Sequence, residues 1–360
     1  MTTPKAERTY WLISQAELEA WLDGMAAVRT LVALRDVAGV LLYRQVSSSG
    51  EIAWSEGKML PDGTRLHAAP TGRSKMSMKE ICFPLTERMF TIRKDGKDIS
   101  LEETFPDKEN IVFGIHPCDA RGIKLLDAVF LDTNPVDAFY ARRRANTTLI
   151  GLACKGLGPT CFCTSVGGAP DDPRDVDIMF YETENGYLVQ VVTEKGRFLI
   201  LAGEWREATS SEIALVKDQP KTGEGQFRIP ERSKWPKHFD DANWLKMAER
   251  CLSCRACSYV CPSCRCFTVR DEMLAPGEFE RLRCWDACAG PNYRRVAGGH
   301  RLRPEKGERL RNRFFCKFVY FPEQYGLGDG SACTGCGRCI DVCPVGMDIT
   351  EMLTDLWRVS

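Results

Sequence analysis

The first 215 residues show two kinds of apolar pattern, which together predict a mixed α/β domain. Residues 15–28 are expected to form a helix, because four large apolar side chains share one face at helical spacing: Leu18, Trp21, Leu22 and Met25. Short apolar runs at 111–115 and 147–153 are typical of buried strands. Between them, residues 119–130 have the spacing of a helix, with Asp119 as the candidate N-cap.

The later part of the chain changes character. Residues 177–182 and 187–192 flank an Asn-Gly turn and predict a β-hairpin. Residues 217–240 are polar, with three prolines and two glycines, and are expected to be a linker. We therefore predict an α/β domain at 1–216, a linker at 217–240 and a small α-helical domain at 241–360 that ends on an amphipathic helix.

Composition adds little to this picture. Apolar residues make up 44% of the chain and charged residues 27%, and the formal net charge is zero. No apolar run approaches the roughly 20 residues that a membrane span requires. The N-terminus lacks the apolar core of a signal peptide. We expect a cytoplasmic protein that binds neither membranes nor nucleic acid through its overall charge.

Cysteine is the residue that changes the interpretation. The chain has 18 cysteines, of which 13 follow residue 250. A reducing compartment disfavours a disulfide framework, so clustered cysteines there indicate metal ligands. Two runs share the pattern C-x2-C-x2-C-x3-C-P, and each cysteine of the second lies 82 residues after its counterpart: Cys251, Cys254, Cys257 and Cys261, then Cys333, Cys336, Cys339 and Cys343.

This spacing matches the bacterial ferredoxin run that binds [4Fe–4S] clusters. In two-cluster ferredoxins the fourth cysteine of each run binds the other cluster. One cluster is then expected on Cys251, Cys254, Cys257 and Cys343. The other is expected on Cys333, Cys336, Cys339 and Cys261. The predicted fold is therefore an α/β domain followed by a ferredoxin-like domain with two clusters.

Two other interpretations of these cysteines fit the pattern less well. Zinc sites usually combine two C-x2-C pairs rather than triples with a trailing C-P, and buried thiols would need no such spacing. The remaining C-terminal thiols are expected to pack around the clusters, although a further metal site is the alternative for four of them: Cys264, Cys266, Cys284 and Cys288.

Four N-terminal cysteines follow the two predicted buried strands: Cys118, Cys154, Cys161 and Cys163. Ligands of open α/β sheets gather beyond the carboxyl ends of the strands. Because four thiolates are the usual complement of a cluster, a third [4Fe–4S] cluster in this crevice is one hypothesis. A reduced cysteine-rich loop, or a redox-active pair at Cys161 and Cys163, are the alternatives.

Residues 293–315 are strongly basic. Nucleic-acid binding is one interpretation. We favour charge balance, since thiolate clusters are anionic and arginine donors nearby stabilise them. A docking face for a partner subunit and an ordinary solvated surface remain alternatives.

Several longer elements give the chain a family resemblance: HPCDARGIKLLD, CFCTSVGGAPDD, CLSCRACSYVCPSCRCF, WDACAGPNYRRVAGGHRLRPEKGERLRNR and CTGCGRCIDVCP. In these elements the chain resembles a family of iron–sulfur subunits from two kinds of enzyme. One is the beta subunit of soluble [NiFe] hydrogenases (sulfhydrogenases), and the other is the iron–sulfur subunit of anaerobic sulfite reductase. The resemblance carries over the first three thiols of each C-P run and Cys118.

That resemblance implies an electron-transfer subunit in a cytoplasmic complex. Its expected partners are a flavin subunit that handles NAD(P)H and a catalytic subunit of hydrogenase, sulfite reductase or heterodisulfide reductase type. The competing hypotheses are a stand-alone thiol or disulfide reductase that uses Cys161 and Cys163, and an iron–sulfur protein that binds nucleic acid.

Overall fold

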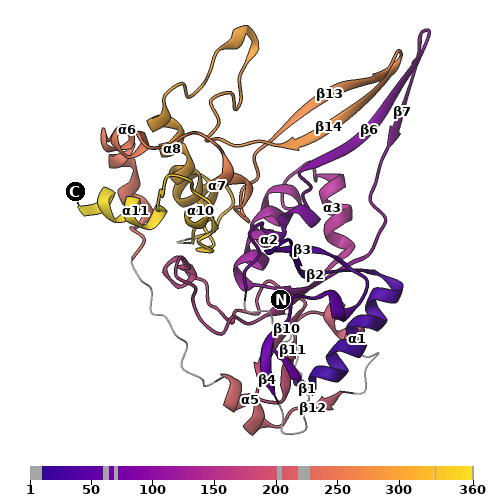
Figure 1. Ribbon diagram of the computed structural model, residues 1–360. Coiled ribbons are helices and arrows are strands. Elements are labelled where there is room, and N and C mark those ends of the chain that lie inside the picture. Colours follow the sequence, from indigo (N-terminus) through magenta and orange to yellow (C-terminus); the bar gives the residue numbers. More distant parts are fainter. Residues whose placement is uncertain are drawn as a thin grey trace, which may run out of the picture.

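The computed structural model describes residues 10–59, 65–68, 72–200, 205–217, 228–328 and 330–358. Its strands are β1 (Tyr10–Ile13), β2 (Thr30–Val37), β3 (Val40–Val46), β4 (Ser55–Met59), β5 (Arg65–Ala68), β6 (Thr86–Asp95), β7 (Asp98–Glu103), β8 (Asn110–Ile115), β9 (Thr147–Leu152), β10 (Ile178–Thr183), β11 (Gly186–Val191), β12 (Arg206–Glu207), β13 (Phe267–Ala275) and β14 (Glu278–Trp285). Figure 1 shows them in one large sheet, a projecting arm and a small hairpin.

The α-helices are α1 (Gln15–Val28), α2 (Pro117–Phe130), α3 (Ala138–Ala145), α4 (Glu194–Ile200), α5 (Ser210–Lys217), α6 (Asn243–Ala248), α7 (Ala256–Tyr259), α8 (Lys306–Phe315), α9 (Phe321–Gln324), α10 (Arg338–Asp341) and α11 (Ile349–Arg358). Shorter helical turns are η1 (Ser49–Glu51), η2 (Met78–Ile81), η3 (Cys163–Val166), η4 (Arg232–His238) and η5 (Ala297–Gly299), and η6 (Cys316–Tyr320) is a π-helix.

The large sheet has eight strands in the order β12-β1-β11-β10-β9-β8-β2-β3. Its centre is parallel, from β2 through β8 and β9 to β10, and antiparallel strands extend both sides. The predicted strands at 111–115 and 147–153 are confirmed as β8 and β9. The predicted hairpin is β10–β11, where Thr183 pairs with Gly186.

Helices cover both faces of this sheet. Along β8, Ile111 and Phe113 pack in one core cluster with Leu18 and Trp21 of α1. Val112 points to the other face, where it packs with apolar side chains of α2. Burial on both faces is typical of a parallel sheet, and each large apolar side chain contributes about 1.5–3 kcal/mol by leaving water. The confirmed helix α1 and its capping box, in which Ser14 and Glu17 cap each other, thus form one layer of three.

Helix α2 begins earlier than predicted. Pro117 stands at its first position and His116 is the N-cap. The expectation that Asp119 caps the helix is wrong, because Asp119 lies inside the first turn and is 1% exposed. Its carboxylate pairs instead with Arg338, whose Nη1 and Nη2 lie 2.8 and 2.5 Å from the two carboxylate oxygens.

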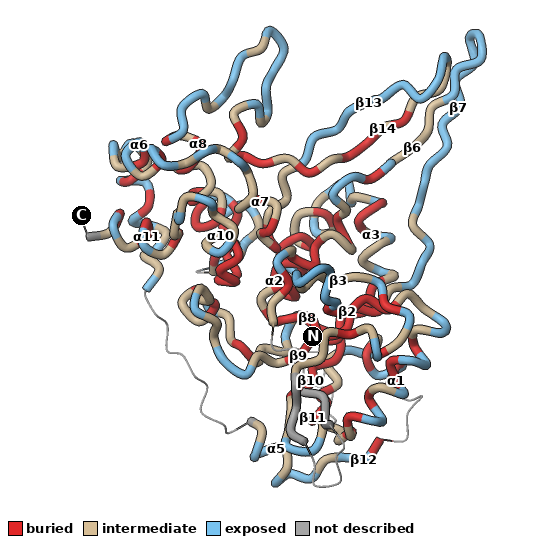
Figure 2. The backbone as a smooth tube through the Cα atoms, viewed as in Figure 1, coloured by how far each residue is buried: buried red, intermediate tan, exposed pale blue. Residues whose placement is uncertain are grey.

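A four-stranded antiparallel sheet forms an arm that projects from the body, in the order β13-β14-β6-β7 (Figure 1). Strand β6 belongs to the N-terminal half and β14 to the C-terminal half, yet they pair from Glu278 opposite Arg93 to Cys284 opposite Thr86. Most of the arm is exposed along its edge strands β7 and β13 (Figure 2). The arm therefore joins the two predicted domains through backbone hydrogen bonds.

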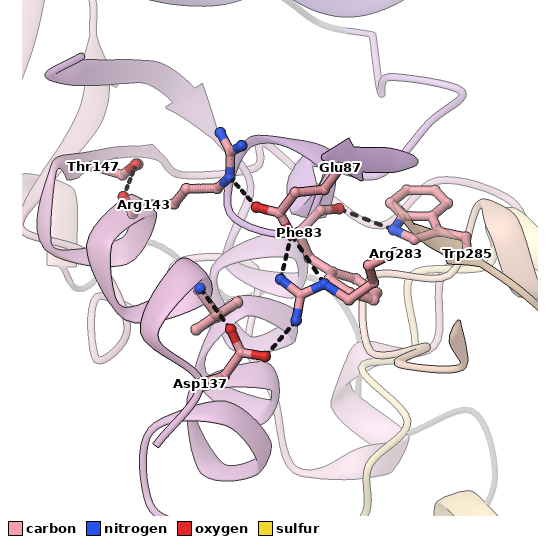
Figure 3. A network of polar contacts seen from close by, with 8 residues as sticks. Phe83, Glu87, Asp137, Arg143, Thr147, Arg283 and Trp285 are labelled. Atoms are coloured by element: carbon pink, nitrogen blue, oxygen red, sulfur yellow. Dashed lines mark hydrogen bonds and ion pairs between the residues drawn. The ribbon is translucent and has the colours of Figure 1, made fainter. Parts of the chain in front are cut away.

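Buried ion pairs fix the base of this arm (Figure 3). Arg283 of β14 pairs with Glu87 of β6 and with Asp137, and both the Arg283 and Glu87 side chains are 1% exposed. Arg143 of α3 also pairs with Glu87, with Nε 2.8 Å from the carboxylate. Because the charges satisfy one another, the hairpin can be buried against α3.

The C-terminal domain has its own aromatic core. Trp235 is fully buried and stacks on Phe318 with ring centroids 5.1 Å apart. Trp235 belongs to η4, so residues 228–240 are part of this core and not of the predicted linker, while 218–227 lie outside the described residues. The predicted C-terminal helix is confirmed as α11, whose Leu353 and Leu356 pack in the same core. The exact division between the domains stays a prediction.

Candidate metal centres

The two cysteine runs fold alike. Helices α7 and α10 begin 82 residues apart, at Ala256 and Arg338, and the residue before each has positive φ: Arg255 at 69° and Gly337 at 72°. The residue before the second cysteine of each run also has positive φ. The repeat in the sequence is thus a repeat in the backbone, which in each run wraps three cysteines around one face of a compact loop.

Four cysteines predicted for the first cluster line one cavity: Cys251, Cys254, Cys257 and Cys343. Three of them come from the first run, and Cys343 is the last cysteine of the second. The thiol of Cys343 accepts the backbone N–H of Met347 at 3.2 Å, and that of Cys251 accepts Ser253 N–H at 3.4 Å. The fold therefore brings together the crossed set that the ferredoxin pattern predicts.

The wall of this cavity carries unsatisfied cationic donors. Arg309 and Arg313 both line it. Within the described residues, Arg309 Nε and Arg313 Nη2 are buried without a hydrogen-bond partner. A buried donor that finds no acceptor costs about 1–3 kcal/mol. An anionic sulfur cluster in the cavity would supply acceptors, so the donor set fits a thiolate-bound [4Fe–4S] group.

The set predicted for the second cluster is more deeply buried. Burial is the main cause that raises the pKa of Cys333 to about 11 and that of Cys339 to about 12, and the nearby Cys261 raises both further. The pKa of Cys336 is also raised, by burial and by Cys261. The four predicted thiols are therefore close enough to influence one another. Since clusters bind thiolates, loading this site must release protons.

One helix supplies a cationic partner to each thiol group. Arg313 hydrogen-bonds the Cys339 thiol. Lys317 Nζ donates to Cys261 Sγ at 3.2 Å and to Ser263 Oγ at 2.9 Å, and this lysine is 8% exposed. The two cations are four residues apart and share a face, where α8 passes into the π-helix η6. Single π-helical turns frequently mark functional sites.

The four cysteines of the α/β domain also share a cavity, of about 320 Å³: Cys118, Cys154, Cys161 and Cys163. Cys118 is on the first turn of α2, Cys154 follows β9, and the other two precede or begin η3. Burial raises the pKa of Cys154 to about 12 and that of Cys163 to about 11. The prediction that two strands deliver these thiols to one crevice is confirmed, while their role is a separate question.

Polar groups around this crevice separate into a cation and a neutral ring. Arg73 Nη1 donates to Cys161 Sγ at 3.3 Å, and the same guanidinium pairs with Asp341 of the second run. His116 also lines the crevice, and burial lowers its pKa to about 4, so the ring is neutral at physiological pH. Tyr43 Oη lies 3.5 Å from His116 Nδ1.

The crevice is in direct contact with the second cysteine run. Cys336 and Gly335 line it together with the α/β cysteines. Phe162 N–H donates to Gly335 O at 2.8 Å. A Cβ at position 335 would lie 2.4 Å from Cys163 Cα, and φ there is +64°, so only glycine allows this approach. Helix α2 approaches the first run similarly, because a Cβ at Gly122 would meet Pro262 Cβ at 2.5 Å.

Comparisons with known proteins agree with this geometry. A family model described as "4Fe-4S dicluster domain" matches residues 250–347, which contain both runs. The chain is 34% identical over 278 residues to sulfhydrogenase 2 subunit beta of Pyrococcus furiosus, an alignment that covers 75% of this chain and 79% of the relative.

The chain belongs to the sulfhydrogenase beta-subunit family.

As a member of this family with a dicluster domain, it is an iron–sulfur protein with two [4Fe–4S] clusters, and that domain implies electron transfer. No solved structure matches the chain. Among the described residues, no helix is long and apolar enough to cross a membrane.

The alternative metal site at Cys264, Cys266, Cys284 and Cys288 is not assembled. Cys266 hydrogen-bonds with both Cys264 and Cys288, whereas Cys284 sits on β14 opposite Thr86. Over the described ranges, no three Cys, His, Asp or Glu side chains converge on a point where one metal ion could bind. A cubane needs no such convergence, because each cysteine binds a different iron. Cys82, expected in the core, is fully buried there.

Sequence reasoning missed the groups that surround the thiols. Lys317 and the Asp119–Arg338 pair depend on contacts between segments far apart in the chain, and the paired aspartate and arginine are 219 positions apart. The basic stretch 293–315 was a usable signal, since Arg309 and Arg313 come from it. Its other arginines lie outside the cavity.

Proposed function

We propose that this protein is the electron-relay subunit of a cytoplasmic multisubunit oxidoreductase. One [4Fe–4S] cluster is held by Cys251, Cys254, Cys257 and Cys343, and the other by Cys333, Cys336, Cys339 and Cys261. Neither set leaves an open ligand position, because four thiolates complete a cubane. The relay therefore passes electrons and binds no substrate at these irons.

The observation that carries the proposal is that the thiol sites share walls. Cys339 of the second set lines the first cavity, and Cys336 of the same set lines the α/β crevice. Three sites thus follow one another through the molecule, with the second set in the middle. Electron transfer slows steeply with distance, and a series of adjacent sites is the arrangement that a relay needs.

The third site of this series is proposed to hold another [4Fe–4S] cluster, on Cys118, Cys154, Cys161 and Cys163. Support comes from the shared cavity and from Arg73, which donates to Cys161 Sγ as Lys317 does to Cys261 Sγ. In both places a cation lies beside a thiolate whose charge a cluster would retain. A redox-active pair at Cys161 and Cys163 would not require the other two thiols.

The proposed partners are a flavin subunit that binds NAD(P)H and a catalytic subunit. The relative's own name supports a hydrogenase-type complex, since it is a subunit of a sulfhydrogenase. A heterodisulfide-reductase or sulfite-reductase partner is the alternative within the same relay role. Identifying copurified subunits distinguishes these partners.

Anaerobic purification from the native host tests the proposal. Two clusters require about eight irons per chain and three require about twelve. We expect copurified flavin and catalytic subunits, and a pure single chain that is reduced by dithionite yet turns over no substrate. Substrate turnover by the pure chain would favour the stand-alone reductase, and an iron-free chain would end the relay proposal.

Paired variants isolate the third site. Cys154→Ser combined with Cys161→Ser should lower the iron content from about twelve to about eight while the dicluster signals persist. Cys266→Ser with Cys288→Ser is the matched control, because these thiols contact each other outside the proposed sets. An unchanged iron content in the first variant would show that the crevice holds no cluster.

A further inference from the structure

An exposed loop begins and ends at the rim of the first cavity. Ala289 and Lys306 both line that cavity, and residues 290–305 connect them between β14 and α8. In Figure 1 this orange loop projects above α8, away from the large sheet. Figure 2 shows it largely exposed. Whatever binds to this loop is therefore held beside the first cluster site.

The loop carries an excess of positive charge that its own carboxylates do not balance. Residues 289–306 contain five lysines and arginines and one carboxylate, although the whole chain is neutral. Arg294, Arg295 and Arg301 are exposed. Across the described part of the chain, none of these three pairs with a carboxylate. The single carboxylate, Glu305, is engaged in capping α8. Surface cations that find no carboxylate within their own chain are available to another molecule.

Exposed apolar side chains accompany these cations. Leu302 is 52% exposed and Val296 47%, and Leu252, which lines the cavity rim, is 62% exposed. Apolar contacts surrounded by charge are the usual composition of a protein–protein interface. Binding to a nucleic-acid backbone alone would leave these apolar groups without a role, and would typically use about six to ten phosphate contacts.

The first cluster site is also the one nearest the surface. Cys254 is exposed, whereas Cys333 and Cys336 of the second set are each 7% exposed. A redox partner must approach a cluster closely to exchange electrons with it. On the basis of the proposed relay function, we propose that residues 289–306 and Leu252 form the docking surface for an acidic electron-transfer protein, which exchanges electrons through the cluster at Cys254.

The partner is recognised by its charge and its apolar centre. Carboxylates around its own redox group would pair with Arg294, Arg295 and Arg301, and an apolar patch would cover Leu252 and Leu302. Complementary charge of this kind raises association rates by about 10- to 1,000-fold at low ionic strength, and salt removes the effect.

Stopped-flow electron transfer tests the docking surface. The whole loaded chain is mixed with a purified acidic two-cluster ferredoxin, reduced beforehand, at increasing salt. The variant Arg294→Glu/Arg295→Glu/Arg301→Glu should lower the second-order rate constant at least tenfold at low salt, with the difference lost near 1 M salt. The matching glutamine variant should lie between it and the wild type.

A control variant separates local from overall charge. Lys97→Glu/Lys108→Glu/Arg142→Glu reverses three exposed cations on the N-terminal side and should leave the rate within about twofold, since charges beyond about 10 Å are screened at 0.1 M salt. Iron content and cluster spectra of both variants report whether the clusters are intact.

The outcomes distinguish the docking surface from the relay itself. Equal rates for wild type and loop variant would overturn the docking surface, and so would a wild type that reacts with reduced methyl viologen but not with the ferredoxin. Failure to accept electrons from methyl viologen would instead contradict the relay function. Loss of DNA or RNA retention in the loop variant, with electron transfer unchanged, would assign the loop to nucleic acid.

Discussion

At the scale of single residues, the thiols are defined by spacing and their environment is defined by the fold. The C-x2-C-x2-C-x3-C pattern names the proposed ligands because one short loop must place three sulfurs around a cluster. Lys317 carries no comparable signal. Its contact with Cys261 crosses 56 residues and arises only when α8 packs against the first run.

Replacement of Lys317 should change the potential of the second cluster. A buried ammonium stabilises the more negative, reduced state of the cluster, so Lys317→Met should lower the reduction potential by roughly tens of millivolts. Redox titration followed by electron paramagnetic resonance measures the shift.

Lys317→Arg keeps the charge and should restore most of the potential. This comparison separates electrostatics from packing, because both substitutions disturb the same space. Wild-type potential in the methionine variant, with full iron content, would mean that the lysine has a structural role alone.

At the scale of elements, regular periodicity was enough for the α/β layers and insufficient for the arm. Helix α1 and strands β8 and β9 follow patterns of buried side chains that their sequences state directly. The pairing of β6 with β14 joins segments about 190 residues apart, as in Arg88 with Leu282. Both strands alternate charged and apolar residues in short stretches, so neither sequence identifies its partner.

The base of the arm should depend on Glu87. Glu87→Ala leaves Arg283 buried without its main carboxylate, which typically costs about 3–5 kcal/mol. Urea unfolding of the iron-loaded chain, followed by tryptophan fluorescence, measures the change in the free energy of unfolding.

The same two strands provide a control pair. Arg93 and Glu278 form an ion pair with side chains 62% and 36% exposed, so Glu278→Ala should cost less than about 1 kcal/mol. Similar losses for both variants would mean that burial does not strengthen the dependence on Glu87.

At the scale of the whole molecule, the two halves differ in what stabilises them. The large sheet is covered by apolar side chains on both faces. The C-terminal half has an aromatic core around Trp235, larger than its cysteine-rich sequence suggests. The loops that carry the cysteines, by contrast, have little regular structure beyond the single turns α7 and α10.

Iron removal should therefore loosen the molecule locally. After anaerobic chelation, residues 251–263 and 333–347 should lose protection from hydrogen exchange, while β8, β9, β10 and α8 stay protected. Hydrogen exchange with mass spectrometry of the whole chain measures this. Loss of protection throughout the large sheet would show instead that iron stabilises both halves.

The arm also limits how the protein can be divided. Because β14 takes its hydrogen-bond partner from β6, a ferredoxin-like fragment cut out after residue 240 would present an unpaired strand edge and a buried arginine without its glutamate. Such a fragment would be prone to aggregate, however well its iron loops formed. Genetic fusion or exchange of the iron-binding half between relatives would succeed only if the β6–β7 hairpin travelled with it.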